Sequence, residues 1–199
     1  MTPDARRKRW LDIALVVMTM PLWLAAVAAL MLAVAICDGR PIFFPQARMG
    51  RGGRHFVIWK LRSMTREADV AQRRPTVLGR RLRHHGLDEL PQLFNVLVGD
   101  MSLVGPRPLE PADLTRLASA SPVFAASLET RLTMAPGLTG LAQVCSARGP
   151  ALTAALDGHY ARQWTLRRDL AILLRTAWIN LVGKRRGARP LPPEMSQII

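Results

Sequence analysis

The segment that decides the fold class runs from Ile13 to Ile36 and reads IALVVMTMPLWLAAVAALMLAVAI, without a charged residue. As one helix it would extend about 36 Å at ~1.5 Å per residue, which is enough to cross the hydrocarbon core of a bilayer. A cleaved secretory signal is disfavoured, because the apolar region of such signals is usually only about 7–15 residues long. The segment therefore predicts a membrane anchor.

Basic residues lie on both sides of this anchor. Arg6, Arg7, Lys8 and Arg9 precede it, and Arg40, Arg48, Arg51, Arg54 and Lys60 follow it. The positive-inside rule places both flanks in the cytoplasm, which a straight span cannot satisfy. Pro21 removes one backbone hydrogen bond and bends the helix, so a re-entrant helix that returns to the same face would satisfy both flanks. Proline kinks also occur in ordinary spans, and the residues alone leave both topologies open.

The formal net charge of the chain is +14, from 28 Lys and Arg against 14 Asp and Glu. Such an excess indicates anionic partners, which could be nucleic acid, an anionic membrane surface or phosphorylated substrates. A nucleic-acid binder needs no apolar segment. The anchor therefore indicates that the anionic partners are membrane lipids and phosphorylated substrates, and it argues against nucleic acid as a partner. Cys37 and Cys145 provide neither a disulfide framework nor metal-ligand spacing.

The rest of the chain predicts a mainly α fold with a small β-hairpin (α+β). Residues 41–44 and 54–59 are rich in aromatic and β-branched residues and flank the glycine-rich turn 50–53, which indicates a hairpin. Residues 114–132 are expected to be helical and 136–140 to form a loop. We divide the chain into a membrane-anchoring segment with its basic flank (1–40), a second domain (41–182) and a loose C-terminal tail (183–199).

A last long helix is expected from about Ala151 or His159 to Val182. It carries Trp164 and Trp178 with interleaved arginines, a pattern typical of an amphipathic helix lying in the lipid headgroup layer. Packing against a soluble core is the alternative that this pattern leaves open.

Asp88 and Glu89 are the most suggestive pair for chemistry. Leu90, Leu93, Phe94 and Leu97 follow helical spacing, which predicts an amphipathic helix that starts near Asp88 and ends at Gly99. A carboxylate at a helix start stays ionised and could attack phosphorus, and the same helix end favours bound phosphate. Asp is also a preferred N-cap residue, so a purely structural role remains open.

A carboxylate that attacks a diphosphate must overcome like-charge repulsion of about 4 kcal/mol at 4 Å and an effective dielectric near 20. The nearby cations are Lys60, Arg62, Arg83 and Arg107, and Arg107 sits in a rigid Gly-Pro-Arg-Pro turn. Mg²⁺ would help more, because it binds through one or two carboxylates together with substrate phosphates. His84 and His85 lack the spacing of a metal-binding pair and are expected to be solvated.

The residues from Leu82 to Pro108, LRHHGLDELPQLFNVLVGDMSLVGPRP, make a family recognisable. This long ungapped stretch resembles the core of the bacterial sugar transferases, the monotopic phosphoglycosyl transferases. The resemblance continues in four further segments, which are Phe44–Gly50, Lys60–Met64, Pro136–Val144 and Asp157–Tyr160.

The resemblance implies a reaction. In this family the residue matching Asp88 attacks the β-phosphate of a UDP-sugar, releases UMP and holds the phospho-sugar covalently. Undecaprenyl phosphate, a polyprenyl phosphate, then attacks that intermediate, so the cycle is ping-pong and Mg²⁺-dependent. Glu89 would help to hold the metal with Asp88. Lys60, Arg62, Arg83 and Arg107 match basic positions near the phosphates, and Asp157 also matches a family site position.

The resemblance also implies a location. Family members anchor by a proline-kinked re-entrant helix, here kinked at Pro21, in the bacterial inner membrane with the catalytic domain on the cytoplasmic face. The product would initiate an exopolysaccharide, capsule, O-antigen or glycoprotein glycan. Longer members carry a multi-helix membrane region in front, so this chain is expected to be the minimal catalytic unit.

One departure from the family concerns a single loop. The usual Asn-Gly-Arg run after Gln143-Val144 is replaced by Cys145-Ser146-Ala147-Arg148, which affects nucleotide or sugar contacts. The alternative function is a membrane-bound phosphate-binding or scaffolding protein without turnover, and the intact Asp88, Glu89 and Arg107 speak against it. The sequence identifies neither the sugar nor an oligomeric state.

Overall fold

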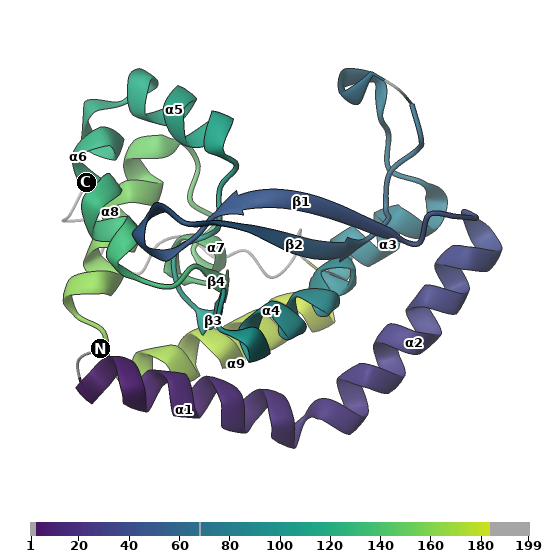
Figure 1. Ribbon diagram of the computed structural model, residues 1–199, viewed down its shortest axis with the longest axis horizontal. Helices are drawn as coiled ribbons and strands as arrows, with labels where there is room; N and C mark the ends of the chain where they lie inside the picture. Colours follow the sequence, from purple (N-terminus) through teal and green to yellow (C-terminus); the bar gives the residue numbers. More distant parts are fainter. Residues whose placement is uncertain (1–2, 68, 184–199) are drawn as a thin grey trace.

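The computed structural model describes residues 3–67 and 69–183 (Figure 1). Within them the chain is mostly helical, with one antiparallel hairpin and one short parallel strand pair. In chain order the elements are α1 (Pro3–Met18), α2 (Met20–Cys37), β1 (Phe43–Met49), η1 (Arg51–Gly53), β2 (His55–Leu61), η2 (Val70–Gln72), α3 (Val77–His85), η3 (Leu87–Gln92), α4 (Leu93–Val98), β3 (Ser102–Val104), α5 (Pro111–Ala120), α6 (Pro122–Thr133), β4 (Gly137–Thr139), α7 (Leu141–Val144), α8 (Pro150–Arg162) and α9 (Leu166–Val182).

The apolar N-terminal segment forms two helices that meet at Thr19. Pro21 occupies the first turn of α2, where its missing N–H disrupts no helical hydrogen bond. Carbonyl groups at the break find side-chain donors: the Thr19 hydroxyl donates to Leu15 O at 2.7 Å, and the Trp23 indole N–H donates to Val16 O at 3.0 Å. The expected single kinked helix is therefore a helix–break–helix, and Figure 1 shows α1 and α2 running in different directions.

These two helices share the main hydrophobic core with the rest of the protein. Val16, Trp23 and Val27 are buried in the same cluster as residues of α4, β3 and α8. The Trp23 ring also meets the Phe94 ring edge-on, with centroids 4.9 Å apart. Helices α1 and α2 are thus packed against the rest of the protein. Of the tail expected at 183–199, residues 184–199 lie outside the described residues.

The predicted hairpin is confirmed. Strands β1 and β2 pair antiparallel from Phe43 opposite Leu61 to Met49 opposite His55. Gly52 and Gly53, with φ of 67° and 74°, supply the left-handed backbone that the connecting turn requires. The hairpin is held to the body by the side chains of Ile58 and Leu61, which are buried in two different core clusters.

Two predicted helices are each divided in the structure. The helix expected over 114–132 is α5 and α6, because Pro122 cannot continue a helix and the Ser121 hydroxyl accepts the Phe124 N–H at 3.2 Å as an N-cap. The long C-terminal helix is α8 and α9, since the Thr165 hydroxyl caps a new helix by accepting the Arg168 N–H at 3.2 Å.

The prediction of a loop over residues 136–140 is partly wrong. Gly137–Thr139 form strand β4, which pairs in parallel with β3 through Ser102 opposite Gly137 and Val104 opposite Thr139. A Cβ on Gly137 would lie 2.1 Å from the Gly105 N atom, so only glycine permits this close approach. The pair fixes the start of the turn that carries Arg107.

Candidate active site

Asp88 lies in a tight turn between two helices. Helix α3 ends at Gly86, whose left-handed backbone (φ 69°) redirects the chain into the 3-10 helix η3. Asp88 is the second residue of η3 and is 6% exposed, while α4 begins only at Leu93. The helical segment thus begins at Leu87, so the predicted start near Asp88 is confirmed, although its first turns are 3-10 and its N-cap is Gly86 and not Asp88. The predicted end is confirmed, since Gly99 follows Val98 with φ of 98°.

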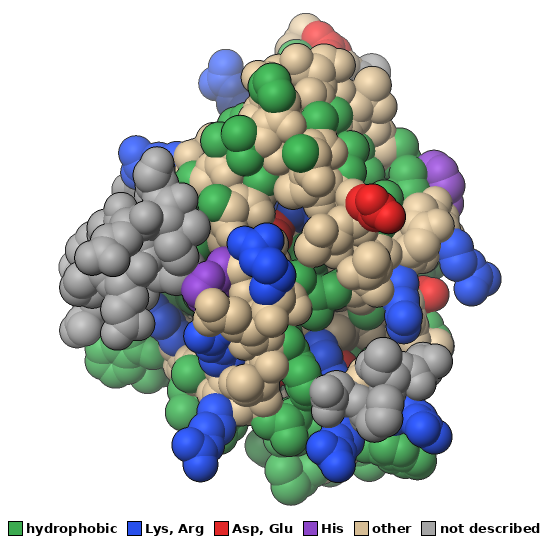
Figure 2. Space-filling model, turned by 90° about the vertical axis from the view of Figure 1, so that its left-hand side faces the viewer, with side chains coloured by type: hydrophobic (Ala, Val, Ile, Leu, Met, Phe, Trp, Pro, Cys, Tyr) green, Lys and Arg blue, Asp and Glu red, His purple; other side chains and the backbone are tan. Residues whose placement is uncertain are grey.

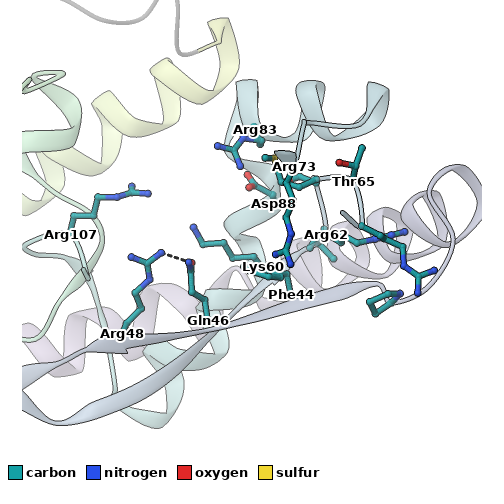
Figure 3. Close-up of a pocket in the computed structure, with 15 residues that line it drawn as sticks. Phe44, Gln46, Arg48, Lys60, Arg62, Thr65, Arg73, Arg83, Asp88 and Arg107 are labelled. Atoms are coloured by element: carbon teal, nitrogen blue, oxygen red, sulfur yellow. Dashed lines mark hydrogen bonds between the residues drawn. The ribbon is translucent and has the colours of Figure 1, made fainter. Parts of the chain in front are cut away.

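Asp88 lines a cavity of about 540 Å³ (Figure 3). The structure brings all four predicted basic residues to its wall: Lys60 and Arg62 from the end of β2, Arg83 from α3 and Arg107 from the turn after β3. Arg48, Arg66 and Arg73 also line it, although they were not among the predicted site residues. The cavity thus joins one buried carboxylate to an excess of positive charge.

Glu89 bridges two of these cations. Its Oε1 atom lies 2.9 Å from Lys60 Nζ and 3.6 Å from Arg107 Nη2. The side chains of Lys60 and Glu89 are mostly buried, at 15% and 17% exposure, so the closer pair is better shielded from solvent than a surface ion pair. Glu89 thereby holds the heads of Lys60 and Arg107 at the wall of the cavity that Asp88 lines.

Arg62 connects the cavity to the C-terminal end of α2. Its guanidinium is buried and donates through Nη2 to the Asp38 carbonyl and, at 2.6 Å, to the Gly39 carbonyl just beyond α2. The Thr76 hydroxyl donates to Asp38 Oδ2 at 2.8 Å from the other side. A cation at the C-terminal end of a helix is favoured by the helix dipole, so Arg62 stabilises the junction as well as lining the cavity.

Two buried arginines hold the turn that presents Arg107. Arg48 donates through Nη1 to the Pro108 carbonyl at 3.2 Å. Arg131 on α6 donates to the Arg107 carbonyl and also to Asp157 Oδ2 on α8. The backbone of the turn is therefore fixed while the Arg107 side chain, which is 46% exposed, reaches the cavity.

Asp157 does not line the cavity. It is 4% exposed and pairs with Arg131, so it reaches the site only through Arg131 and the backbone of Arg107. Burial raises the pKa of the Asp157 carboxyl, an effect that the Arg131 charge opposes. Sequence reasoning missed Arg131, because no local pattern marks a contact between residues 26 positions apart. Arg48 lies inside the Phe44–Gly50 segment of the family resemblance, which could have identified it.

The described residues contain no group of three His, Cys, Asp or Glu side chains suited to a metal ion. Asp88 and Glu89 nevertheless provide two adjacent carboxylates next to the cavity, and Mg²⁺ commonly uses such a pair with substrate phosphates. Two carboxylates do not complete a metal site by themselves, so a metal here would need substrate phosphates as further ligands. His85, expected to be solvated, instead forms a 2.6 Å hydrogen bond through Nδ1 with the Asn180 carbonyl and ties α3 to α9.

Comparison with known proteins gives one family. The model of the bacterial sugar transferase family matches residues 4–183. The UDP-glucose:undecaprenyl-phosphate glucose-1-phosphate transferase of Caulobacter vibrioides is 44% identical over 185 residues, covering 85% of this chain and 68% of that protein. The undecaprenyl-phosphate galactose phosphotransferase of Salmonella typhimurium is 36% identical over 176 residues, covering 76% of this chain.

The alignments cover different shares of these relatives. The match spans only 35% of the Salmonella protein, but 73% of an uncharacterized sugar transferase of Bacillus subtilis that is 38% identical over 154 residues. The matched region nevertheless includes almost every described element, from α1 to the end of α9. The chain therefore belongs to the bacterial sugar transferase family.

Proposed function

We propose that this protein transfers a sugar-1-phosphate from a UDP-sugar to undecaprenyl phosphate through a covalent intermediate on Asp88. The observation that carries the proposal is the buried Asp88 carboxylate at the wall of a cavity lined by Lys60, Arg62, Arg83 and Arg107. Relatives named for glucose and galactose transfer to the same lipid carrier support the reaction class.

The proposed chemistry has two in-line displacements at one phosphorus. An Asp88 oxygen attacks the β-phosphorus, the bond from that phosphorus to the bridging oxygen breaks, and UMP leaves with the bonding electrons. A phosphate oxygen of the lipid carrier then attacks the same phosphorus and displaces Asp88, which gives a lipid diphosphate sugar. Splitting a hard transfer into two displacements is the usual advantage of covalent catalysis.

The basic residues make the first attack feasible. Repulsion between the carboxylate and a phosphate is about 4 kcal/mol at 4 Å and a dielectric near 20, so the surrounding cations must neutralise the phosphates. Arg107 has a fixed backbone and can bridge phosphate oxygens with its planar guanidinium. Asp88 and Glu89 would hold Mg²⁺, which would supply charge stabilisation at the phosphates.

We further propose that α1 and α2 form a re-entrant anchor at the cytoplasmic face of the inner membrane. In the part of the chain that the structure describes, Met20–Cys37 is the one helix long and apolar enough to cross a membrane. The break at Thr19 lets both basic flanks stay on one side, as the positive-inside rule favours. Figure 2 shows hydrophobic side chains along the lower edge of one face, with Lys and Arg side chains above and among them.

Helix α9 supports the same orientation. Leu166, Leu170, Leu174, Trp178 and Leu181 recur every three or four residues, and all five side chains are exposed. The opposite face of the helix is packed, with Asp169 and Ile172 buried. An exposed apolar stripe on a helix that also packs inward favours contact with lipid over contact with water.

The test is UMP release from a panel of UDP-sugars by detergent-solubilised protein with Mg²⁺ and undecaprenyl phosphate. We expect lipid-dependent release that is lost in Asp88→Asn and retained in Asp113→Asn, a matched change on α5 away from the cavity. A radiolabelled sugar should remain on wild-type protein when the lipid is omitted. An Asp88→Asn variant as active as wild type would refute the covalent mechanism, and no release with any sugar would favour a scaffold without turnover.

A further inference from the structure

A cavity of about 570 Å³, the α1 cavity, lies where α1, the hairpin turn, α6 and α8 meet. Its wall is formed by the N-terminal part of α1, by η1, by the C-terminal ends of α6 and α8, and by Trp164 just before α9. None of the residues that line it also lines the cavity around Asp88. Its volume is typical of ligand-binding pockets, so it is a candidate binding site separate from the active site.

Positive charge predominates in the α1 cavity. Asp12 is the acidic residue that lines it, and both of its carboxylate oxygens already accept hydrogen bonds, from the Ser102 hydroxyl at 2.8 Å and the Leu103 N–H at 3.2 Å. The basic side chains that line it are those of Lys8, Arg9, Arg51 and Arg162. Four cations against one hydrogen-bonded carboxylate attract an anion into the cavity.

The protein itself compensates the charge of one of these cations. Lys8 forms an ion pair with the buried Asp169. Arg9 donates to two carbonyl groups at the end of α4, and a carbonyl carries no net charge, so the charge of its guanidinium group remains. Arg51 and Arg162 are exposed, and within the described residues their guanidinium groups form neither a hydrogen bond nor an ion pair. These two side chains are therefore available to an external anion.

The α1 cavity lies next to the residues that the proposed anchor would bring to the membrane surface. Trp10, which follows Arg9 on α1, is exposed, and Leu166 begins the exposed apolar stripe of α9 two residues after Trp164. Exposed Trp beside basic residues is typical of the headgroup layer. Figure 2 faces the side of the molecule where α1 begins and shows Lys and Arg side chains just above the hydrophobic lower edge. The anions that are concentrated at this level are the phosphates of lipids.

We propose that the α1 cavity binds the headgroup of an anionic phospholipid, with Arg51 and Arg162 contacting its phosphate. Basic pockets beside membrane helices on the cytoplasmic side bind such headgroups, and a guanidinium group can contact two phosphate oxygens at once. Because the two arginines belong to the hairpin turn and to α8, one lipid would hold both segments against α1. The inference rests on the proposed position of α1 at the membrane surface and not on the transfer chemistry.

The experiment titrates short-chain phosphatidylglycerol into detergent-purified protein without a UDP-sugar and measures the bound lipid by native mass spectrometry. The double variant Arg51→Gln with Arg162→Gln is compared with Arg80→Gln with Arg81→Gln. The second pair removes the same charge from exposed positions on α3 that line neither the α1 cavity nor the Asp88 cavity.

For Arg51→Gln with Arg162→Gln we expect the dissociation constant to rise about 25-fold, since each cation beside an anionic headgroup contributes ~1 kcal/mol, or about fivefold. The α3 pair should stay within about twofold of wild type. Phosphatidylcholine has the same phosphate but no net charge, so it should bind wild type much more weakly than phosphatidylglycerol does.

A substitution that adds an acidic group tests the same cavity in the opposite way. Thr133→Glu places a carboxylate at an exposed position of the wall and should weaken phosphatidylglycerol, whereas Thr115→Glu on α5 should not. Equal losses in the two double variants would indicate general surface attraction and overturn the site. Glycerol phosphate that competes as well as the intact lipid would identify a soluble anion and overturn the lipid assignment. No UDP-sugar is present, so a wild type that releases no UMP would remove the proposed function and leave this result standing.

Discussion

Arg131 is the residue that links Asp157 to the candidate site. Its guanidinium is buried between the Asp157 carboxylate and the Arg107 carbonyl. Burial lowers the pKa of Arg131 and raises that of Asp157, so desolvation opposes the charged form of each partner. Ion pairs of this kind contribute little net stability, but breaking one partner leaves an uncompensated buried charge.

We therefore expect Asp157→Asn to destabilise the protein by about 3–5 kcal/mol, because Arg131 keeps its charge without a counter-ion. The double variant Asp157→Leu with Arg131→Met should regain most of this stability and still transfer sugar poorly, since the Arg107 carbonyl loses its donor. Equilibrium unfolding in detergent and UMP release measure the two effects. A double variant with full activity would show that the pair does not position Arg107.

Ser146 adopts a backbone conformation that favours glycine. Its φ is 51°, and it stands in the loop where the family usually carries Asn-Gly-Arg. The left-handed region costs a residue with a Cβ about 1–2 kcal/mol, whereas glycine loses about 0.5–1 kcal/mol more chain entropy on folding. Ser146→Gly should therefore raise the unfolding free energy by about 0.5–1 kcal/mol, measured by denaturant unfolding beside Ser127→Gly on α6, which should be destabilised. A loss of stability in Ser146→Gly would contradict the strain argument.

At the scale of elements, the break between α1 and α2 depends on Trp23. Its indole N–H donates a hydrogen bond to the Val16 carbonyl in the last turn of α1, and its ring packs on Phe94 of α4. Trp23→Phe keeps an aromatic ring but leaves the Val16 carbonyl with only the long 3.4 Å contact from the Thr19 hydroxyl, which should cost about 1 kcal/mol. Trp10→Phe is the control, because Trp10 is 70% exposed and a surface change of this kind costs about 0.5 kcal/mol or less. Thermal unfolding in detergent distinguishes the two, and equal shifts would mean that the indole hydrogen bond does not hold the break.

At the scale of the whole molecule, a re-entrant anchor places the start of α1 and the catalytic body on one side of the membrane. The test uses a background with Cys37→Ala and Cys145→Ala and introduces either Arg6→Cys or Ala120→Cys, both at exposed positions. A membrane-impermeant maleimide should leave both sites unlabelled in spheroplasts and label both after permeabilisation. Labelling of Arg6→Cys alone in intact spheroplasts would indicate a spanning helix.

Local chemistry in the sequence was sufficient for several features of this protein. The apolar run around Pro21 predicted a bent membrane-seeking segment, and the aromatic and β-branched residues around Gly50–Gly53 predicted the hairpin that forms. Gly99 ended a helix as expected, because only glycine takes its backbone conformation freely. The segment from Leu82 to Pro108 identified the family, and the comparisons confirm it.

Only the tertiary structure decided the features that depend on residues distant in the sequence. Three such contacts join separate segments of the chain. Strand β4 pairs with β3, and Arg131 pairs with Asp157. Glu89 forms ion pairs with both Lys60 and Arg107. Ser121 and Thr165 are N-cap residues whose type is a local signal for the start of the next helix, and the predicted helices ran across both of them. Hydropathy and spacing predict whether a side chain lies on the buried or the exposed face of its helix or strand. Which distant side chain it contacts depends on how the helices and strands pack together.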